Sequence, residues 1–113
     1  MIRRIRERAA FERLAAHGTR IRRPALWCTW CPDPDSTSTS VAFAITRALG
    51  SAVTRNRLRR RLRVLLVEFD RAQPRQPSLL LIGATPKAVE LTFDQLRTEL
   101  TLLLQQLPPA SSA

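Results

Sequence analysis

The sequence predicts one α+β domain, spanning residues 1–113, in which helices pack against a mixed β-sheet as a two-layer sandwich. The 113 residues are 44% hydrophobic, which is enough for one modest core but not for two. Apolar residues alternate along the chain between helical spacing and short continuous runs. A predicted strand, helix and strand follow one another over residues 41–84, and strands joined by a helix pair in parallel. The ends, residues 1–5 and 108–113, are expected to be flexible.

The predicted order of elements is α-β-β-β-α-β-α. Residues 5–17 form the first helix because Phe11 and Leu14 recur at helical spacing, and Gly18 ends it. Strands are expected at residues 20–23, 25–31 and 41–46. The polar, acidic segment at residues 32–39 is expected to be a loop.

The second half of the chain contains an arginine-rich helix, a buried strand and a last helix. The arginine-rich helix is predicted over residues 51–70, with Ser51 as its N-cap. Its apolar stripe consists of Leu58, Leu62, Leu65 and Phe69, with Leu66 at the margin. The apolar run at residues 79–84 is typical of a buried strand. Thr92 and Gln95 predict a capping box at the start of the last helix.

The net charge of +10 is concentrated in the first part of the chain. Residues 1–63 contain 15 arginines and four carboxylates, a net +11, whereas residues 64–113 have a net charge of −1. All but one of the 19 basic residues are arginine, whose forked guanidinium suits phosphates and flat rings. A polyanion is the simplest partner, with an acidic membrane surface as the alternative. The sequence shows neither a secretory signal nor an apolar run near 20 residues, so we expect a cytoplasmic protein.

The arginine-rich helix carries the sharpest functional signal. Six of the nine positions from Arg55 to Arg63 are arginine, and none is acidic. Pairs four residues apart, such as Arg55 with Arg59, repel each other by roughly 0.2–0.5 kcal/mol. These cations also crowd the first half of the helix, where the macrodipole disfavours them. On a face that is merely solvated, one or two glutamates would relieve both costs. Their absence predicts a surface for binding phosphates.

Cys28 and Cys31 have the spacing of zinc sites and thiol redox sites. Zinc needs four ligands, and the chain adds only His17, which stands beside Gly18 as a helix-end residue. A redox site would place the first cysteine at a helix start, whereas this segment is a predicted strand. We therefore expect reduced thiols that are buried or partly buried.

The segment Gly50-Ser-Ala-Val-Thr-Arg-Asn-Arg-Leu-Arg-Arg-Arg-Leu-Arg63 resembles the signature of the bacterial ribonuclease P protein subunit, in which Arg-Asn-Arg follows Gly-Asn-Ala-Val. Weaker matches extend over nearly the whole chain, from Arg8-Ala-Ala-Phe11 to Thr92-Phe-Asp-Gln-Leu-Arg97. The resemblance implies a left-handed β-α-β crossover through the arginine-rich helix, although right-handed crossovers are the rule.

This family works with a catalytic RNA, and together they remove the 5′ leader from precursor tRNA. The resemblance implies an endonuclease whose catalytic centre lies in the RNA, with Mg²⁺ in the assembled enzyme. It implies no catalytic residue in this chain and no metal or cofactor bound by the protein alone. The implied contacts to the RNA subunit are Arg55, Asn56, Arg57, Arg59, Arg60 and Arg63. Neither a membrane nor a small-molecule substrate is expected.

Family members hold the single-stranded leader in a cleft between the first helix and the sheet. Phe11 matches an aromatic of that cleft, and Arg47 matches one of two basic positions before the glycine. Two further aromatic positions are Ala15 and Thr29 here, so leader binding is expected to be weaker or differently arranged. Trp27, on the same strand face as Thr29, either supplies the missing ring or is a core or edge tryptophan. The expected leader-binding residues are Phe11, Trp27, Thr29 and Arg47.

Three other classes of protein compete with this interpretation. A self-sufficient nuclease would need an acid and a base, but the chain has one histidine, and its early carboxylates lack metal-binding spacing. A ribosomal or RNA-chaperone protein would use the same helix without a role in cleavage. A DNA-binding zipper would have only about two heptads before the next strand.

Overall fold

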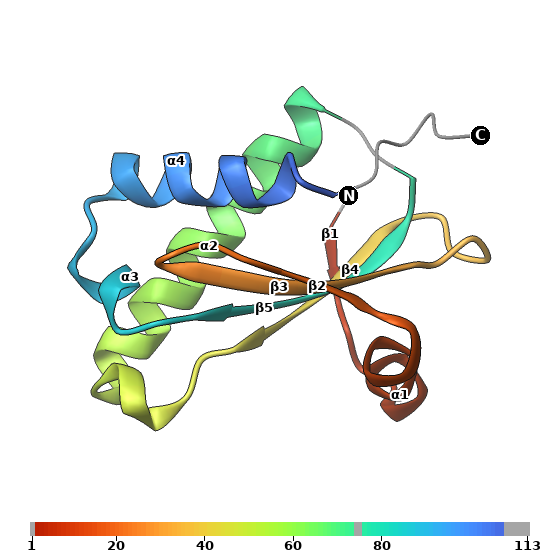
Figure 1. The fold of residues 1–113 in the computed structure, drawn as a ribbon, viewed down its shortest axis with the longest axis horizontal. Coiled ribbons are helices and arrows are strands. Elements are labelled where there is room, and N and C mark those ends of the chain that lie inside the picture. The colour runs from red at the N-terminus through yellow and green to blue at the C-terminus, as the bar shows by residue number, and fades with distance from the viewer. Residues whose placement is uncertain (1, 74–75, 108–113) are drawn as a thin grey trace.

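The computed structural model describes residues 2–73 and 76–107 and contains a five-stranded sheet with helices on both faces (Figure 1). The elements in chain order are β1 (Ile2–Arg4), α1 (Arg8–His17), β2 (Thr19–Arg22), β3 (Leu26–Pro32), β4 (Thr39–Ala44), the 3-10 turn η1 (Arg47–Leu49), α2 (Ala52–Ala72), β5 (Ser78–Ala84), α3 (Lys87–Glu90) and α4 (Phe93–Leu104). The α+β class and the predicted order of the main elements are confirmed.

The strands lie in the order β1-β4-β5-β3-β2. Strand β4 runs parallel to both of its neighbours, β1 and β5, whereas β3 pairs antiparallel with β5 and with β2. The sheet is therefore mixed, and α2 connects the two adjacent parallel strands β4 and β5, as the sequence predicts. The left hand of this crossover stays a prediction from the resemblance.

The main core lies between the sheet and helices α2 and α4. Because strand side chains alternate between faces, Leu26 and Cys28 of β3 and Leu80 and Ile82 of β5 all enter this core. Figure 1 shows α4 on this side of the sheet and α1 on the other. Under α1 lies a smaller cluster of buried residues, which contains Ile5, Leu14, Cys31 and Leu79. Helix α1 leaves part of its face of the sheet uncovered, since Trp27 and Thr29 of β3 are only half-buried.

The structure differs from the sequence-based expectation at the start of the chain. Residues 2–4, expected to be flexible, form strand β1, which pairs with residues 39–41 of β4. Three residues are too few to show an alternating pattern, and the partner strand is remote in sequence. Helix α1 begins at Arg8, because Ile5 hydrogen-bonds through its amide to the Val41 carbonyl and so extends the pairing. The other expected flexible end, residues 108–113, lies outside the described residues.

The two later helices follow their sequence signals closely. The Ser51 hydroxyl accepts a hydrogen bond from the Thr54 amide at 3.2 Å, and the capping box of Thr92 and Gln95 is present. Within the α2 stripe, Leu66 is buried whereas Phe69 is only partly buried. No helix within the described residues is both long enough and apolar enough to cross a membrane.

The two cysteines lie on opposite faces of β3, because they stand three residues apart in a strand. Cys28 is in the core against α2 and α4, and Cys31 is in the cluster under α1. Both are free and buried, as expected, and their positions prevent a shared metal or a disulfide. Burial raises the pKa of the Cys28 thiol to about 11, so this thiol stays protonated near neutral pH.

Candidate nucleic-acid interface

Helix α2 presents its arginines from a fixed position on the sheet. Gly50 has a φ of 126°, which side-chain-bearing residues rarely adopt, and this turn leads directly into the Ser51 cap. Four leucines of α2 are buried in the core, namely Leu58, Leu62, Leu65 and Leu66. The buried stripe fixes the rotation of the helix, so the intervening arginines are held at its flanks and outer side.

A groove of about 570 Å³ separates α2 from β4, and we call it the α2–β4 groove. Its polar lining consists of Arg4, Asn56, Arg59, Arg60 and Arg63. Its apolar lining consists of Ile5, Val41, Ala42 and Phe43. The groove therefore combines guanidinium groups from β1 and α2 with an apolar wall.

Arg59 is the most firmly held cation of this groove. Its Nη1 donates to Oδ1 of Asn56 at 2.9 Å, and its Nη2 donates to the carbonyl oxygen of Ile45 at 3.1 Å. Arg63 lies over the ring of Phe43, with its Cζ 5.7 Å from the ring centroid. These contacts order two guanidinium groups before any ligand arrives, which lowers the entropy lost on binding.

The positive charge of α2 is not neutralised within the described residues. None of the six arginines from Arg55 to Arg63 forms an ion pair there. The ion pairs that the described residues do form lie elsewhere: Arg8 with Glu12, Arg13 with Asp33, Arg23 with Glu99, and Arg97 with Glu68 and Asp94. A dense, unpaired cationic surface attracts a polyanion and repels other cations.

The structure brings together four of the six predicted contacts to an RNA subunit, since Asn56, Arg59, Arg60 and Arg63 all line the groove. The other two lie outside it. Arg55 donates from Nε to the Gly50 carbonyl at 3.2 Å, near the helix start, and Arg57 is exposed. Sequence reasoning missed Arg4, whose place in the groove depends on the unpredicted strand β1.

The expected leader-binding residues share one side of the sheet, apart from Arg47. Trp27 and Thr29 alternate with the core residues of β3, so both point to the face that α1 partly covers. Phe11 of α1 is on the same side of the sheet and is 42% exposed. Arg47 is exposed in the turn η1, beyond the end of β4.

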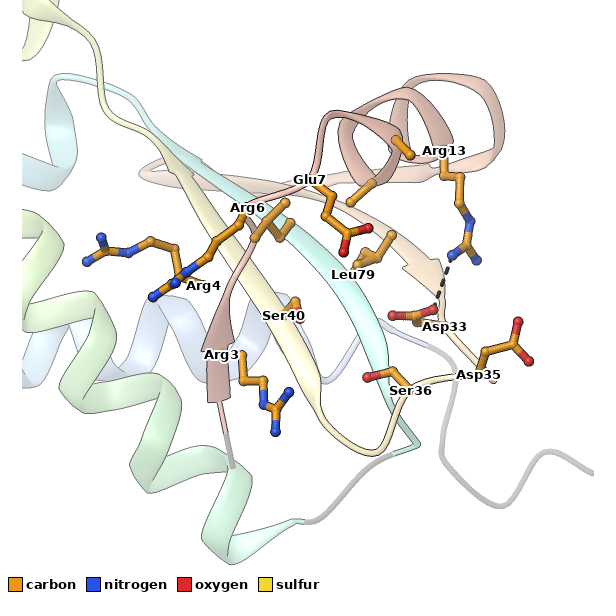
Figure 2. A pocket seen from close by; sticks show the side chains of 13 residues that line it. Arg3, Arg4, Arg6, Glu7, Arg13, Asp33, Asp35, Ser36, Ser40 and Leu79 are labelled. Atoms are coloured by element: carbon orange, nitrogen blue, oxygen red, sulfur yellow. Dashed lines mark hydrogen bonds and ion pairs between the residues drawn. The ribbon is translucent and has the colours of Figure 1, made fainter.

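A second groove, of about 760 Å³, lies between β1, α1 and the loop from β3 to β4 (Figure 2). Its lining mixes four arginines, Arg3, Arg4, Arg6 and Arg13, with three carboxylates, Glu7, Asp33 and Asp35. Arg4 also lines the α2–β4 groove, so the two grooves adjoin at this residue. Figure 2 shows Arg13 reaching from α1 to Asp33, a hydrogen bond of 3.1 Å that raises the pKa of the Arg13 guanidinium. The internal acids make this groove a weaker site for polyanions than the α2–β4 groove.

No three histidine, cysteine, aspartate or glutamate side chains among the described residues come together as a metal site. His17 is exposed in the last turn of α1, as expected for a helix-end residue.

Comparisons with known proteins agree with one another. A family model described as Ribonuclease P matches residues 2–108. The ribonuclease P protein component of Micrococcus luteus is 39% identical over 107 residues, which cover 86% of this chain and 81% of that protein. The component of Thermobifida fusca is 34% identical over 109 residues, covering 90% of this chain and 74% of its own.

Two solved structures show the same fold at low sequence identity. The RNase P protein of Staphylococcus aureus has a TM-score of 0.81 at 20% identity, covering 90% of this chain and 92% of its own. The RNase P protein of Thermotoga maritima has a TM-score of 0.81 at 19% identity, covering 93% and 97%. On the family match and the two relatives, this chain belongs to the family of bacterial ribonuclease P protein subunits.

Proposed function

We propose that this chain binds the catalytic RNA of ribonuclease P and assists it in removing the 5′ leader from precursor tRNA. The α2–β4 groove is the surface that holds the RNA subunit. The observation that carries the proposal is the convergence of Arg4, Arg59, Arg60 and Arg63 on one groove without an internal carboxylate partner in the described part of the chain.

Each group of the proposed RNA surface has a role that follows from its contacts. Arg60 is exposed, and Arg63 rests on the Phe43 ring, so both can donate to phosphate oxygens of a folded RNA. Asn56 and Arg59 bond to each other and hold the groove in shape. Arg55 and Arg57 extend the cationic surface along α2 beyond the groove.

The leader is assigned to the other face of the sheet, beside α1. The exposed ring of Phe11 suits an unpaired strand, because every base has a π-face on which it can stack. Trp27 and Thr29 lie on the same side of the sheet, and Arg47 adds a cation beyond β4. The RNA subunit and the leader thus contact different faces of one small domain.

Bond cleavage is assigned to the RNA. Mg²⁺ held by the RNA would supply the nucleophile and stabilise the leaving group in the assembled enzyme. In this proposal the protein contributes binding and positioning only, and neither its exposed histidine nor its scattered carboxylates take part in bond cleavage.

Reconstitution tests the proposal. The chain is mixed with its cognate RNA at near-physiological Mg²⁺, and 5′ cleavage of precursor tRNA is scored with and without protein. Cleavage should require the RNA and increase strongly with the protein, and the complex should prefer precursor tRNA over mature tRNA. Cleavage by the protein alone would contradict the proposal, and equal binding of the two tRNAs would favour a general RNA-binding protein.

A further inference from the structure

The indole of Trp27 packs over Gly83 of β5. Trp27 of β3 is paired with Gly83 of β5. A Cβ atom added at Gly83 would lie 2.0 Å from Cε2 and 2.1 Å from Cζ2 of the indole. The ring therefore fills the space that a side chain at position 83 would occupy.

The indole ring is covered by an arginine that the sequence did not single out. Cζ of Arg20 lies 4.1 Å from the centroid of the Trp27 ring. Arg20 stands on β2 opposite Thr29, so it reaches Trp27 diagonally across the same face of the sheet. Arg20 is exposed, and its N–H groups have no hydrogen-bond or ion-pair partner in the part of the chain that the structure describes.

Trp27 thus contacts both Gly83 and Arg20, and Arg20 places its guanidinium group over the ring. A base cannot stack on the ring face that Arg20 covers unless Arg20 moves away. The guanidinium itself is planar and cationic, and such groups both stack on unpaired bases and donate to phosphates. Its attachment to the ring restricts its rotamers in advance, so less entropy is lost when a ligand binds.

We propose that Arg20 is a leader-binding residue, on which an unpaired base of the precursor tRNA leader stacks, and that Trp27 is the support that positions it. This inference rests on the proposed function. It replaces direct stacking on Trp27 by stacking on the cation that covers the ring. The competing explanation is that Arg20 only protects the exposed edge strand β2 from pairing with other chains. That role would leave leader recognition independent of Arg20.

The test uses the complex of the full chain with its cognate catalytic RNA. The ratio of affinities for precursor tRNA and mature tRNA measures the leader preference. Arg20→Ala should lower this ratio by about 5- to 10-fold, since a stacked base contributes strongly to binding single strands. Arg20→Lys keeps the charge but loses the plane, so it should lower the ratio by about 2- to 4-fold. Arg22→Ala removes an equal charge from the same face of β2 and should change the ratio by less than about twofold.

Trp27 variants separate support from direct stacking. Trp27→Phe keeps an aromatic support and should retain most of the preference, whereas Trp27→Leu should lose it. If Arg20 binds the leader only while Trp27 supports it, the double variant Trp27→Leu with Arg20→Ala should have nearly the same leader preference as Trp27→Leu alone. Circular dichroism and affinity for the catalytic RNA should stay unchanged in all variants that keep the fold.

Three results would overturn the inference. One is an Arg20→Ala complex whose preference for precursor tRNA over mature tRNA equals that of wild type or of Arg22→Ala. Another is that Trp27→Leu lowers the leader preference whereas Arg20→Ala leaves it unchanged or raises it. The base would then stack on the indole itself. A wild-type complex without any leader preference would contradict the proposed function as well, and this outcome is recognised before any variant is compared.

Discussion

Removal of the Arg59 side chain separates two opposing effects in the α2–β4 groove. Arg59→Ala deletes the hydrogen bonds to Asn56 and to the Ile45 carbonyl. At roughly 0.5–1.5 kcal/mol each, their loss lowers the free energy of unfolding by about 1–3 kcal/mol. The change also removes repulsion from Arg55 and Arg63, which returns roughly 0.2–0.5 kcal/mol for each pair. The loss of the two hydrogen bonds outweighs the relief of repulsion, and a net destabilisation of about 0.5–2 kcal/mol is expected.

Urea unfolding followed by far-UV circular dichroism measures this difference, with Arg60→Ala as the matched control. Arg60 is exposed and has no hydrogen bond within the described residues, so its removal should leave stability within about 0.5 kcal/mol of wild type. Arg59→Lys should be intermediate, because an ammonium group cannot reproduce the two forked contacts. If Arg59→Ala unfolds at the same urea concentration as Arg60→Ala, the two bonds do not hold the guanidinium in place, and the reasoning is wrong.

Four further outcomes are expected. Arg60→Ala should weaken binding to the catalytic RNA and make the salt dependence shallower by about one unit of log–log slope, and an unchanged slope would count against a phosphate contact. Phe11→Ala should lower leader preference about fivefold while sparing RNA assembly, and loss of the circular dichroism signal would instead place Phe11 in the core. In the folded state the pKa of Cys28 is about 11, above its ordinary 9.0, so the buried thiol stays protonated at a pH where the unfolded chain has lost this proton. The free energy of unfolding should therefore fall by about 2–3 kcal/mol as pH rises from about 9 to about 11. Cys28→Ala should lack that fall. Gly83→Ala should cost about 1–3 kcal/mol, because the new methyl must displace the Trp27 indole, and it should lower leader preference as well.

Local sequence signals predicted the elements that depend on near neighbours. The leucine stripe of α2 and the capping box of Thr92 and Gln95 both arise within a few residues, so spacing alone identifies them. The opposite faces of Cys28 and Cys31 also follow from strand periodicity, once the segment is recognised as a strand.

Features that depend on strand register could not be read from the sequence. Strand β1 has three residues and pairs with a strand more than 30 positions away, so Arg4 could not be assigned to the groove. The stack of Arg20 on Trp27 depends on a diagonal across β2 and β3 and on the absence of a side chain at Gly83. Sequence reasoning identified Trp27 but not the cation that covers it.

We propose that the affinity for the catalytic RNA depends on the position of the groove arginines and not on net charge alone. The most direct test compares two double variants with equal charge, Arg60→Gln with Arg63→Gln in the groove, and Arg8→Gln with Arg22→Gln outside it. The affinity of each for the catalytic RNA is measured across a salt series. The groove variant should bind at least about tenfold more weakly than the control, and its salt dependence should be shallower by about two units. Equal losses in the two variants would show that overall charge is sufficient and would contradict the account.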